Sequence, residues 1–368
     1  MMTARRTPNK PADVSASNLV NPPTMHQSMP DPVQLLLNAE NAPAITDRLN
    51  LFPFDWRVET PRLMDIYENA RDPGWSPSKL PWDTLDVESF TLDQRYAISY
   101  WWALLSVFDA SGPAVFARAM IHAYEVHEED PIRKCFFSVT RDEMNHEEVC
   151  GRAITKLTPN GPLGYEPETT LGKLAQNNIR WLYHNGARYW NGYKKAVEHY
   201  PMPILFSSFL FGEVASSTLF HSMYESTDIP VFKEAFRHIG RDEGRHLSFC
   251  LALLKEVLPK LTDEDKDVIT KQIRAGFVFL SGILHEPPSD FWHLPDTFLP
   301  AQRLLEEKAR EAGFGILTVE KREENWRTAV LRLKAVLEPH GVKFPALPEI
   351  GVDGETVSFD ADKIVPIF

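Results

Sequence analysis

Two six-residue segments with the pattern Arg-Asp-Glu-x-x-His lie 100 residues apart in the chain, at Arg141–His146 and Arg241–His246. Before each segment stands a turn with a proline, at Asp130-Pro131 and at Ile229-Pro230. Proline is favoured at the first position of a helix, so each segment is expected on the second helix of a helix-turn-helix pair. The sequence therefore predicts a duplicated pair of antiparallel helices, and this duplication restricts the fold more than any other feature.

Helical spacing of apolar residues continues through most of the chain, and strand-like alternation is nearly absent. The expected helices cover about 91–130 with a break at 111–113, then 130–157, 170–199, 203–226, 230–258, 262–283, 301–312 and 318–337. Helices of this length are typical of bundles rather than of globin-like packing. The predicted fold class is all-α.

Composition divides the chain into three parts. Residues 1–53 are rich in Pro, Asn, Ser and Thr and predict an extended or mobile N-terminal arm. Residues 54–338 are the predicted helical domain, whose beginning, from Trp56 to Trp82, alternates aromatics with prolines and is expected to be irregular. Residues 339–368 are interrupted by prolines and predict an extended C-terminal segment.

The charge balance excludes several classes of partner. The 51 acidic and 39 basic side chains give a formal net charge of −12, whereas phosphate backbones and anionic lipids require clustered Lys and Arg. The three cysteines are too few for a disulfide framework, and the N-terminus has no apolar core of signal-peptide length. No stretch approaches about 18 consecutive apolar residues. We expect a cytoplasmic protein that binds neither nucleic acid nor membrane.

Each repeated segment offers a pair of metal ligands. A glutamate and a histidine three residues apart lie on neighbouring turns of one helix face, where both can reach the same ion. The pairs are Glu143 with His146 in the first segment. The corresponding pair in the second segment is Glu243 with His246. Because both pairs share the Arg-Asp-Glu prefix and the same place in the helix pair, we predict that they form one two-metal site.

A two-metal site in a four-helix bundle also needs a carboxylate from each of the two other helices. Glu213 lies about as far before the turn at 228–230 as Glu243 lies after it, so the two meet at similar depth. The neighbours of Glu213 are apolar, and a carboxylate that bound nothing would be costly there. Glu213 is therefore the expected ligand from the second helix pair.

The first helix pair leaves two candidates for the remaining carboxylate. Equal-depth counting from Asp130 points near Ala114, where no acid exists. Asp109 lies in an apolar run just before the break at 111–113, and a kink or bulge at this break would absorb the extra residues. Asp109 is the preferred ligand, and Glu125, close to the turn, is the alternative.

Arg241–His246 resembles the Asp-Glu-x-Arg-His signature of the ferritin-like diiron carboxylate superfamily. This superfamily includes the ribonucleotide reductase small subunit, acyl carrier protein desaturases, multicomponent monooxygenase hydroxylases, rubrerythrin-like proteins and arylamine N-oxygenases. The first segment is similar but has Asn145 where the signature usually has Arg. The resemblance covers about residues 92–258 and implies a ferritin-like four-helix bundle core with additional helices.

The resemblance also implies a ligand set for two iron ions, with manganese possible at one position: Asp109, Glu143, His146, Glu213, Glu243 and His246. Asp142 and Asp242 are similar to aspartates that accept a hydrogen bond from a ligating imidazole and so fix its tautomer. Cys150 lies one turn after His146, where the family pattern places the radical tyrosine of the reductase small subunit. This chain lacks that tyrosine, and some monooxygenase hydroxylases have a cysteine there.

We expect an O2-activating diiron oxygenase that hydroxylates or N-oxygenates a small organic substrate. Some of the aromatics near the motifs, such as Phe108, Phe116 and Phe209, would line an apolar cavity for that substrate. The expected catalytic carboxylates shift to open a coordination position for dioxygen, and they are Glu143, Glu213 and Glu243. A ferredoxin or reductase as electron donor is implied by the resemblance, and a homodimer is expected.

Three alternatives remain open at this point. The first is a desaturase that acts on a carrier-bound acyl chain. The second is a protein like the ribonucleotide reductase small subunit, which the missing tyrosine weakens. The third is a relative of ferritin with ferroxidase or peroxidase activity.

Overall fold

The computed structural model describes residues 56–71, 74–158, 166–199, 202–284, 286–287 and 292–358, without the side chains of 189–190, 192–199 and 202–208. The predicted N-terminal arm, residues 1–53, lies outside these ranges, as do residues 359–368 of the predicted C-terminal segment. The long helices of the described part are α2 (Pro61–Arg71), α3 (Leu92–Asp109), α4 (Gly112–Glu125), α5 (Asp130–Leu157), α6 (Thr170–His199), α7 (Met202–Ser226), α8 (Pro230–Val257), α9 (Asp263–Leu284), α11 (Phe298–Glu311) and α12 (Val319–Leu337).

The all-α prediction is confirmed, because the only extended pairing within the described ranges consists of isolated bridges, Pro345 with Glu355 and Leu347 with Val352. The ferritin-like form of the bundle remains a prediction. Most helix bounds agree with the expected ranges to within a few residues. The exception is α2, because the segment from Trp56 to Trp82 was expected to be irregular and instead contains an 11-residue helix.

Local sequence signals explain where α3 begins and where it ends. Thr91 accepts a hydrogen bond from the backbone N–H of Gln94, and the Gln94 side chain accepts one from the backbone N–H of Thr91. This capping box satisfies two backbone donors that a helix start would leave free. At the other end α3 stops at Asp109, and Pro113 stands in the first turn of α4, where it needs no backbone donor. Asp109 is thus the last residue of its helix.

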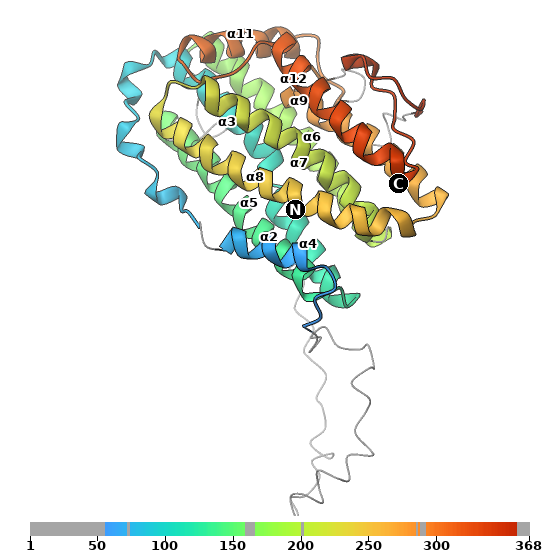
Figure 1. Ribbon diagram of the computed structural model, residues 1–368. Helices are drawn as coiled ribbons and strands as arrows, with labels where there is room; N and C mark the ends of the chain where they lie inside the picture. Colours follow the sequence, from blue (N-terminus) through green and yellow to red (C-terminus); the bar gives the residue numbers. More distant parts are fainter. Residues whose placement is uncertain are drawn as a thin grey trace, which may run out of the picture. The chain divides into compact units, whose positions relative to one another are not determined.

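Two helix pairs form the part of the fold that carries the repeated motifs. The first pair is α4 with α5 and the second is α7 with α8, each joined by a short connection and packed along its length. In addition α3 packs on α5, and α5 contacts α8, so these helices lie side by side (Figure 1). Further helices cover this group: α6 and α11 lie on α3, while α9 and α12 lie on α7. The two Arg-Asp-Glu-x-x-His segments therefore meet where α5 contacts α8.

Large aromatics fill the core between α3 and α8. Trp102 on α3 is fully buried, and its ring lies 5.2 Å from those of Phe232 and Phe236 on α8, measured between centroids. Phe314, just after α11, closes the cluster at 5.7 Å from Trp102. Aromatic side chains bury large apolar areas, and their edge-to-face contacts add to this gain. The cluster therefore fixes α3 against the motif helix α8.

The described part of the C-terminal segment, up to residue 358, is non-helical apart from two short 3-10 turns. Its apolar side chains Val342, Phe344 and Leu347 are buried. The hydroxyl of Thr270 on α9 donates to the carbonyl of Lys343 at 2.6 Å. The segment is thus attached to α9 at Lys343, and Arg274 of α9 also donates to the Glu349 carboxylate.

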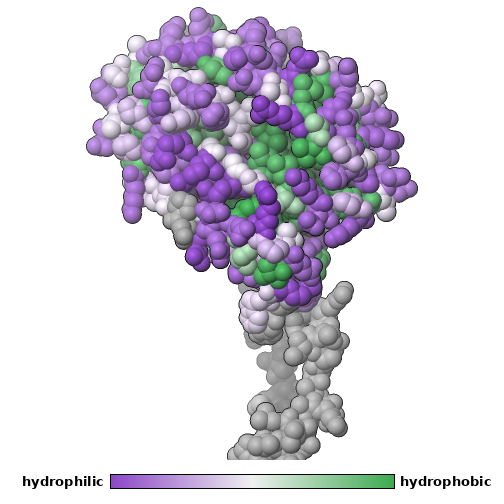
Figure 2. All heavy atoms as spheres, in the orientation of Figure 1, coloured by the Kyte–Doolittle hydropathy of each residue, from purple (hydrophilic) through white to green (hydrophobic). Residues whose placement is uncertain are grey.

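The surface is mostly hydrophilic on the face that Figure 2 shows, with apolar patches between the polar side chains. One stretch of the described residues, Leu92–Glu125, is long and apolar enough for a membrane span by length and composition alone. A core helix of a soluble protein passes the same test, and this stretch is divided into α3 and α4. The expectation that no helix spans a membrane stays a prediction.

Truncation of Trp102 is expected to destabilise the domain strongly. Trp102→Ala should lower the free energy of unfolding by about 3–5 kcal/mol, because it leaves a cavity among three aromatic rings. The matched control is Trp56→Ala, since Trp56 is 72% exposed and loses little packing. Urea unfolding followed by circular dichroism measures both values. Similar losses for the two variants would contradict the role given to the α3–α8 aromatic cluster.

Candidate metal centre

Six buried side chains meet in the interior of the helix group, from α3, α5, α7 and α8. Ligand atoms of one set lie within 4.8 Å of one another, and this set is Glu143, Glu213, Glu243 and His246. A second set meets the same limit and consists of Asp109, His146 and Glu243. All six side chains are at most 7% exposed. Since Glu243 belongs to both sets, the cluster offers two neighbouring metal positions with one shared carboxylate.

Each imidazole turns its Nδ1 atom toward the carboxylates. The Nδ1 of His246 lies 3.3 Å from Glu213 Oε2 and 3.4 Å from Glu143 Oε1. The Nδ1 of His146 lies 3.4 Å from Glu243 Oε1 and 3.8 Å from Glu143 Oε2. The spacing of three residues within each motif places Glu143 beside His146 and Glu243 beside His246, on one helix face in both cases. The Nδ1 atoms are therefore the donors directed at the metal positions.

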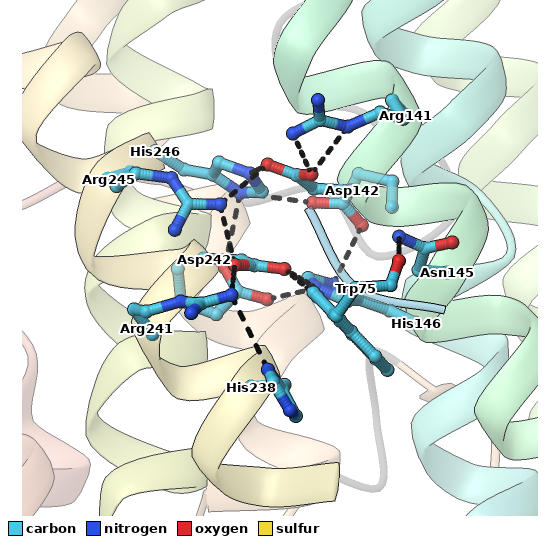
Figure 3. A network of polar contacts seen from close by, with 12 residues as sticks. Trp75, Arg141, Asp142, Asn145, His146, His238, Arg241, Asp242, Arg245 and His246 are labelled. Carbon is cyan, nitrogen blue, oxygen red and sulfur yellow. Dashed lines mark hydrogen bonds and ion pairs between the residues drawn. The ribbon is translucent and has the colours of Figure 1, made fainter. Parts of the chain in front are cut away.

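The opposite nitrogen of each imidazole faces an aspartate of the other motif. His146 Nε2 lies 3.5 Å from Asp242 Oδ2, and His246 Nε2 lies 3.5 Å from Asp142 Oδ2 (Figure 3). A carboxylate in this place favours the tautomer with the proton on Nε2, which leaves the Nδ1 lone pair free for a metal. The sequence placed Asp142 and Asp242 beside the imidazoles but did not show that each aspartate serves the partner motif.

Arginine side chains hold the two aspartates. Arg245 donates to Asp142 Oδ2 at 3.0 Å and to Asp242 Oδ1 at 2.6 Å, so one guanidinium joins both motifs. Arg141 donates to Asp142 Oδ1 at 2.7 Å. Charge-assisted hydrogen bonds of this kind are strong and fix the direction of the carboxylates. Because Arg245 reaches both aspartates, the departure from the signature at Asn145 leaves neither of them without an arginine.

Trp75 is a member of the site that sequence analysis missed. Its indole N–H donates to Asp242 Oδ2 at 2.7 Å, and its ring stacks on His238 with centroids 4.8 Å apart. Asn145 donates to the backbone carbonyl of Trp75 at 3.4 Å. Trp75 lies between two prolines in a segment without helical spacing, so no local pattern marked it. Only the packing of this segment on α5 and α8 brings it to the site.

The structure brings Asp109, and not Glu125, into the cluster. Asp109 is buried at the end of α3, and the thiol of Cys150 donates to its Oδ2 at 3.4 Å. Glu125 has a half-exposed side chain, and its Oε2 lies 3.6 Å from the Nδ1 of His122. The break between α3 and α4 places Asp109 at the level of Glu143 although the residue count from the turn does not. Cys150 is accordingly a buried neighbour of the cluster.

Gly112 makes room for Glu143. A Cβ atom on Gly112 would lie 2.7 Å from Glu143 Cδ and closer still to its Oε2. Real Cβ atoms essentially never approach other atoms so closely, so any other residue would displace the carboxylate or the start of α4. Gly112, which the sequence indicated as part of a helix break, thus also leaves room for the Glu143 carboxylate at the metal positions.

The carboxylates repel one another inside the protein. Burial, together with the charges of Glu143 and Glu243, raises the pKa of Asp109 to about 8. Burial and the charge of Glu243 raise the pKa of Glu213 well above its ordinary value and also raise that of Glu143. Burial alone would raise the pKa of Glu243, but the imidazoles of His146 and His246 lower it. Ionisation of all four carboxyls at once is therefore unfavourable without added positive charge.

The imidazoles respond in the opposite direction. Burial alone would lower the pKa of His146, but Asp242 and Glu243 raise it well above the ordinary value. The pKa of His246 is raised likewise by Glu213 and Asp142, against the effect of burial. Protons on these rings partly balance the carboxylates where a metal ion would otherwise do so.

These residues fit a pair of metal ions. Within the part of the chain that the structure describes, Glu213 Oε2 and both Nδ1 atoms are buried and, like the two Nε2 atoms, make no hydrogen bond of normal geometry, although His246 Nδ1 lies 3.3 Å from Glu213 Oε2. Such atoms are costly unless they bind something, and their positions coincide with the two ligand sets. A mixed set of carboxylates and imidazoles suits iron, manganese and zinc and does not distinguish among them. A buried Glu/His/Asp cluster that can hold metal is thus present, and the identity of the metal remains a prediction.

A cavity of about 110 Å³ adjoins the carboxylates. Asp109, Glu143, Glu213 and Glu243 form one part of its wall. The rest of the wall is mostly apolar and includes the three aromatics named from the sequence, Phe108, Phe116 and Phe209. A small molecule bound in this cavity would lie next to the metal positions.

No protein-family model matches the chain, and no curated protein matches it significantly. The resemblance to the ferritin-like diiron proteins therefore rests on the motif residues and stays a prediction.

Gly112→Ala is expected to reduce metal binding. The added Cβ would collide with the Glu143 carboxylate, so at least one of the two ions should be lost. The control is Gly151→Ala on α5, because a Cβ at Gly151 meets no atom within 4 Å. Metal content after anaerobic reconstitution, with circular dichroism to verify folding, measures the effect. Equal metal content in the two variants would show that Gly112 has no such role.

Metal affinity is expected to rise with pH. In the metal-free protein the raised pKa values of Asp109, Glu213 and the imidazoles favour their protonated forms. A metal ion must displace these protons, and displacement becomes easier as pH rises toward the pKa of Asp109, about 8. Titration with Mn²⁺ at several values between about pH 6 and 8 measures the trend. A constant affinity over this range would contradict it.

Proposed function

We propose that the protein is a non-haem diiron oxidoreductase, an oxygenase that hydroxylates or N-oxygenates a small organic substrate. One observation carries the proposal: four carboxylates and two imidazoles from four helices are buried around two neighbouring metal positions beside an apolar cavity. When bound, two iron ions supply redox chemistry with dioxygen, in which one oxygen atom enters the substrate and the other leaves as water, with two electrons from an external donor and two protons. The donor would be a ferredoxin or a reductase.

The ligating side chains have distinct tasks in this proposal. Asp109 and His146 hold one position, while Glu213 and His246 hold the other. Glu243 belongs to both sets and would be available to either ion, and Glu143, a member of the set with Glu213 and His246, lies near both imidazoles. Because a carboxylate can hold an ion through one oxygen or two, Glu143, Glu213 and Glu243 would be the side chains that shift to leave a position for dioxygen.

The surrounding residues keep the cluster ready for its ions. Asp142 and Asp242 orient the imidazoles, and Arg245 neutralises these two aspartates so that they do not compete for the ions. The Cys150 thiol donates to Asp109 and limits the rotation of its carboxylate. The apolar walls keep water away from the reacting atoms. Asp142, Asp242 and Arg245 therefore act as positioning residues.

The size of the cavity favours an oxygenase of small molecules over an acyl desaturase. Pockets for drug-sized ligands measure roughly 300–1,000 Å³, whereas this cavity measures about 110 Å³. A long acyl chain does not fit into such a space. The cavity also argues for organic turnover rather than iron storage, because storage requires no apolar chamber at the metal.

Replacement of Glu213 is the test of this proposal. Glu213→Ala should abolish oxygen consumption while helicity persists, because it removes a ligand with a buried, unpartnered oxygen. The control is Glu125→Ala, since Glu125 is half-exposed and lies away from the cluster. The assay incubates the reduced, iron-loaded protein with dioxygen and candidate metabolites and follows product mass. Unchanged turnover in Glu213→Ala would refute the assignment, and a product that has lost two hydrogens would point to a desaturase.

A further inference from the structure

We propose that the cavity beside the carboxylates takes a small, uncharged, apolar molecule or group of about one six-membered ring, and that Gly212 sets the size limit. The inference rests on the proposed function, because it names the substrate class for the same site. The inference follows from the volume of the cavity, from the charge of its wall and from the open space at the Cβ position of Gly212.

Volume and shape restrict the ligand to a single ring or a short alkyl group. An apolar cavity of roughly 150 Å³ is known to bind benzene, and the present cavity of about 110 Å³ is of the same order. Phe116 and Phe209 lie on its walls with ring centroids 5.0 Å apart, and Phe108 and Phe279 form a second pair of lining rings at 4.9 Å. Flat aromatic walls favour a planar apolar guest.

The charge of the wall excludes anions. Among the described residues that line the cavity there is no lysine and no arginine, and four of these residues are carboxylates. These four carboxylates already balance the charge of two divalent ions, so a carboxylate or phosphate on the ligand would be buried without a counter-charge of its own, which costs several kcal/mol. The polar groups on the wall other than the acids are the hydroxyls of Ser111 and Ser216. These hydroxyls suit an uncharged substituent.

Gly212 is a lining residue of the cavity without a side chain to fill it. Among the side chains that the structure describes and the backbone outside its own helical turn, a Cβ on Gly212 would meet no atom within 4 Å. Gly212 and Ser216 lie one turn apart on α7 and are half-buried, whereas Phe209 and Glu213 are buried. Because Gly212 lines the cavity and the position of its Cβ is open, a larger side chain at 212 is expected to narrow the cavity.

Gly276 on α9 also lines the cavity but has a different role. A Cβ there would lie 3.3 Å from Phe211 Cδ1, so the missing side chain allows α9 and α7 to pack closely. Substitution at Gly276 would disturb the packing of Phe211. Gly212 is thus the lining glycine at which ligand size can be changed without a clash.

Calorimetric binding of two probes tests the inference. Toluene and benzoate carry the same ring, but benzoate adds a negative charge. We expect toluene to bind and benzoate to bind at least about tenfold more weakly, because the anion has no counter-charge. Gly212→Leu should weaken toluene binding by at least about tenfold while metal content and circular dichroism stay unchanged. The matched control is Gly151→Leu, an open glycine on α5 outside the cavity, which should bind toluene like the natural chain.

Two results would overturn the inference: benzoate that binds as tightly as toluene, or a folded Gly212→Leu protein that binds toluene with unchanged affinity. Iron content is measured in the same samples, so the two proposals can fail separately. If toluene binds but the chain holds no iron after reconstitution, the proposed function fails and the cavity inference stands. If iron binds but toluene does not, the cavity inference fails and the diiron proposal stands.

Discussion

The burial of four carboxylates at one point of the helix group is the constraint on which the rest of the site depends. Within the described ranges no lysine or arginine forms an ion pair with Asp109, Glu143, Glu213 or Glu243, and each is at most 7% exposed. Such a cluster is stable only if protons or cations neutralise it. The raised pKa values of three of these carboxyls and of both imidazoles correspond to the first solution. The proposed pair of metal ions is the second.

The crossed contacts between the two motifs explain why the duplicated helix pairs must act together. Each imidazole is oriented by an aspartate of the other pair, and Arg245 holds both aspartates. Neither half can therefore fix its own histidine. The aromatic cluster around Trp102 and the contact of α5 with α8 place the two halves at the required distance. Core packing thus determines the distances between the side chains of the site.

The net charge of −12 has a different meaning once the site is considered. Six of the acids, namely the four cluster carboxylates, Asp142 and Asp242, are buried. They do not contribute to the exposed surface, and bound cations would neutralise part of their charge. On the other side of the cluster the cavity wall is apolar and without basic groups among its described residues. The carboxylates at the metal positions and the uncharged remainder of the cavity wall together define which ligands the proposed enzyme can accept.

The sequence by itself determined the all-α fold class, most helix bounds and five of the six cluster residues, because capping, helical spacing and the Glu-x-x-His pattern are local properties of the chain. Tertiary structure decided what depends on distances between helices. It brought Asp109 rather than Glu125 into the cluster. Counting residues back from the turn at Asp130 did not predict this, because the break between α3 and α4 shifts the position of Asp109 along the bundle axis. Helix packing places each aspartate beside the histidine of the other motif. It also brings Trp75 to Asp242, and it places Gly112 where only a glycine leaves room for the Glu143 carboxylate. Contacts between side chains remote in sequence arise from helix packing, which no local pattern encodes.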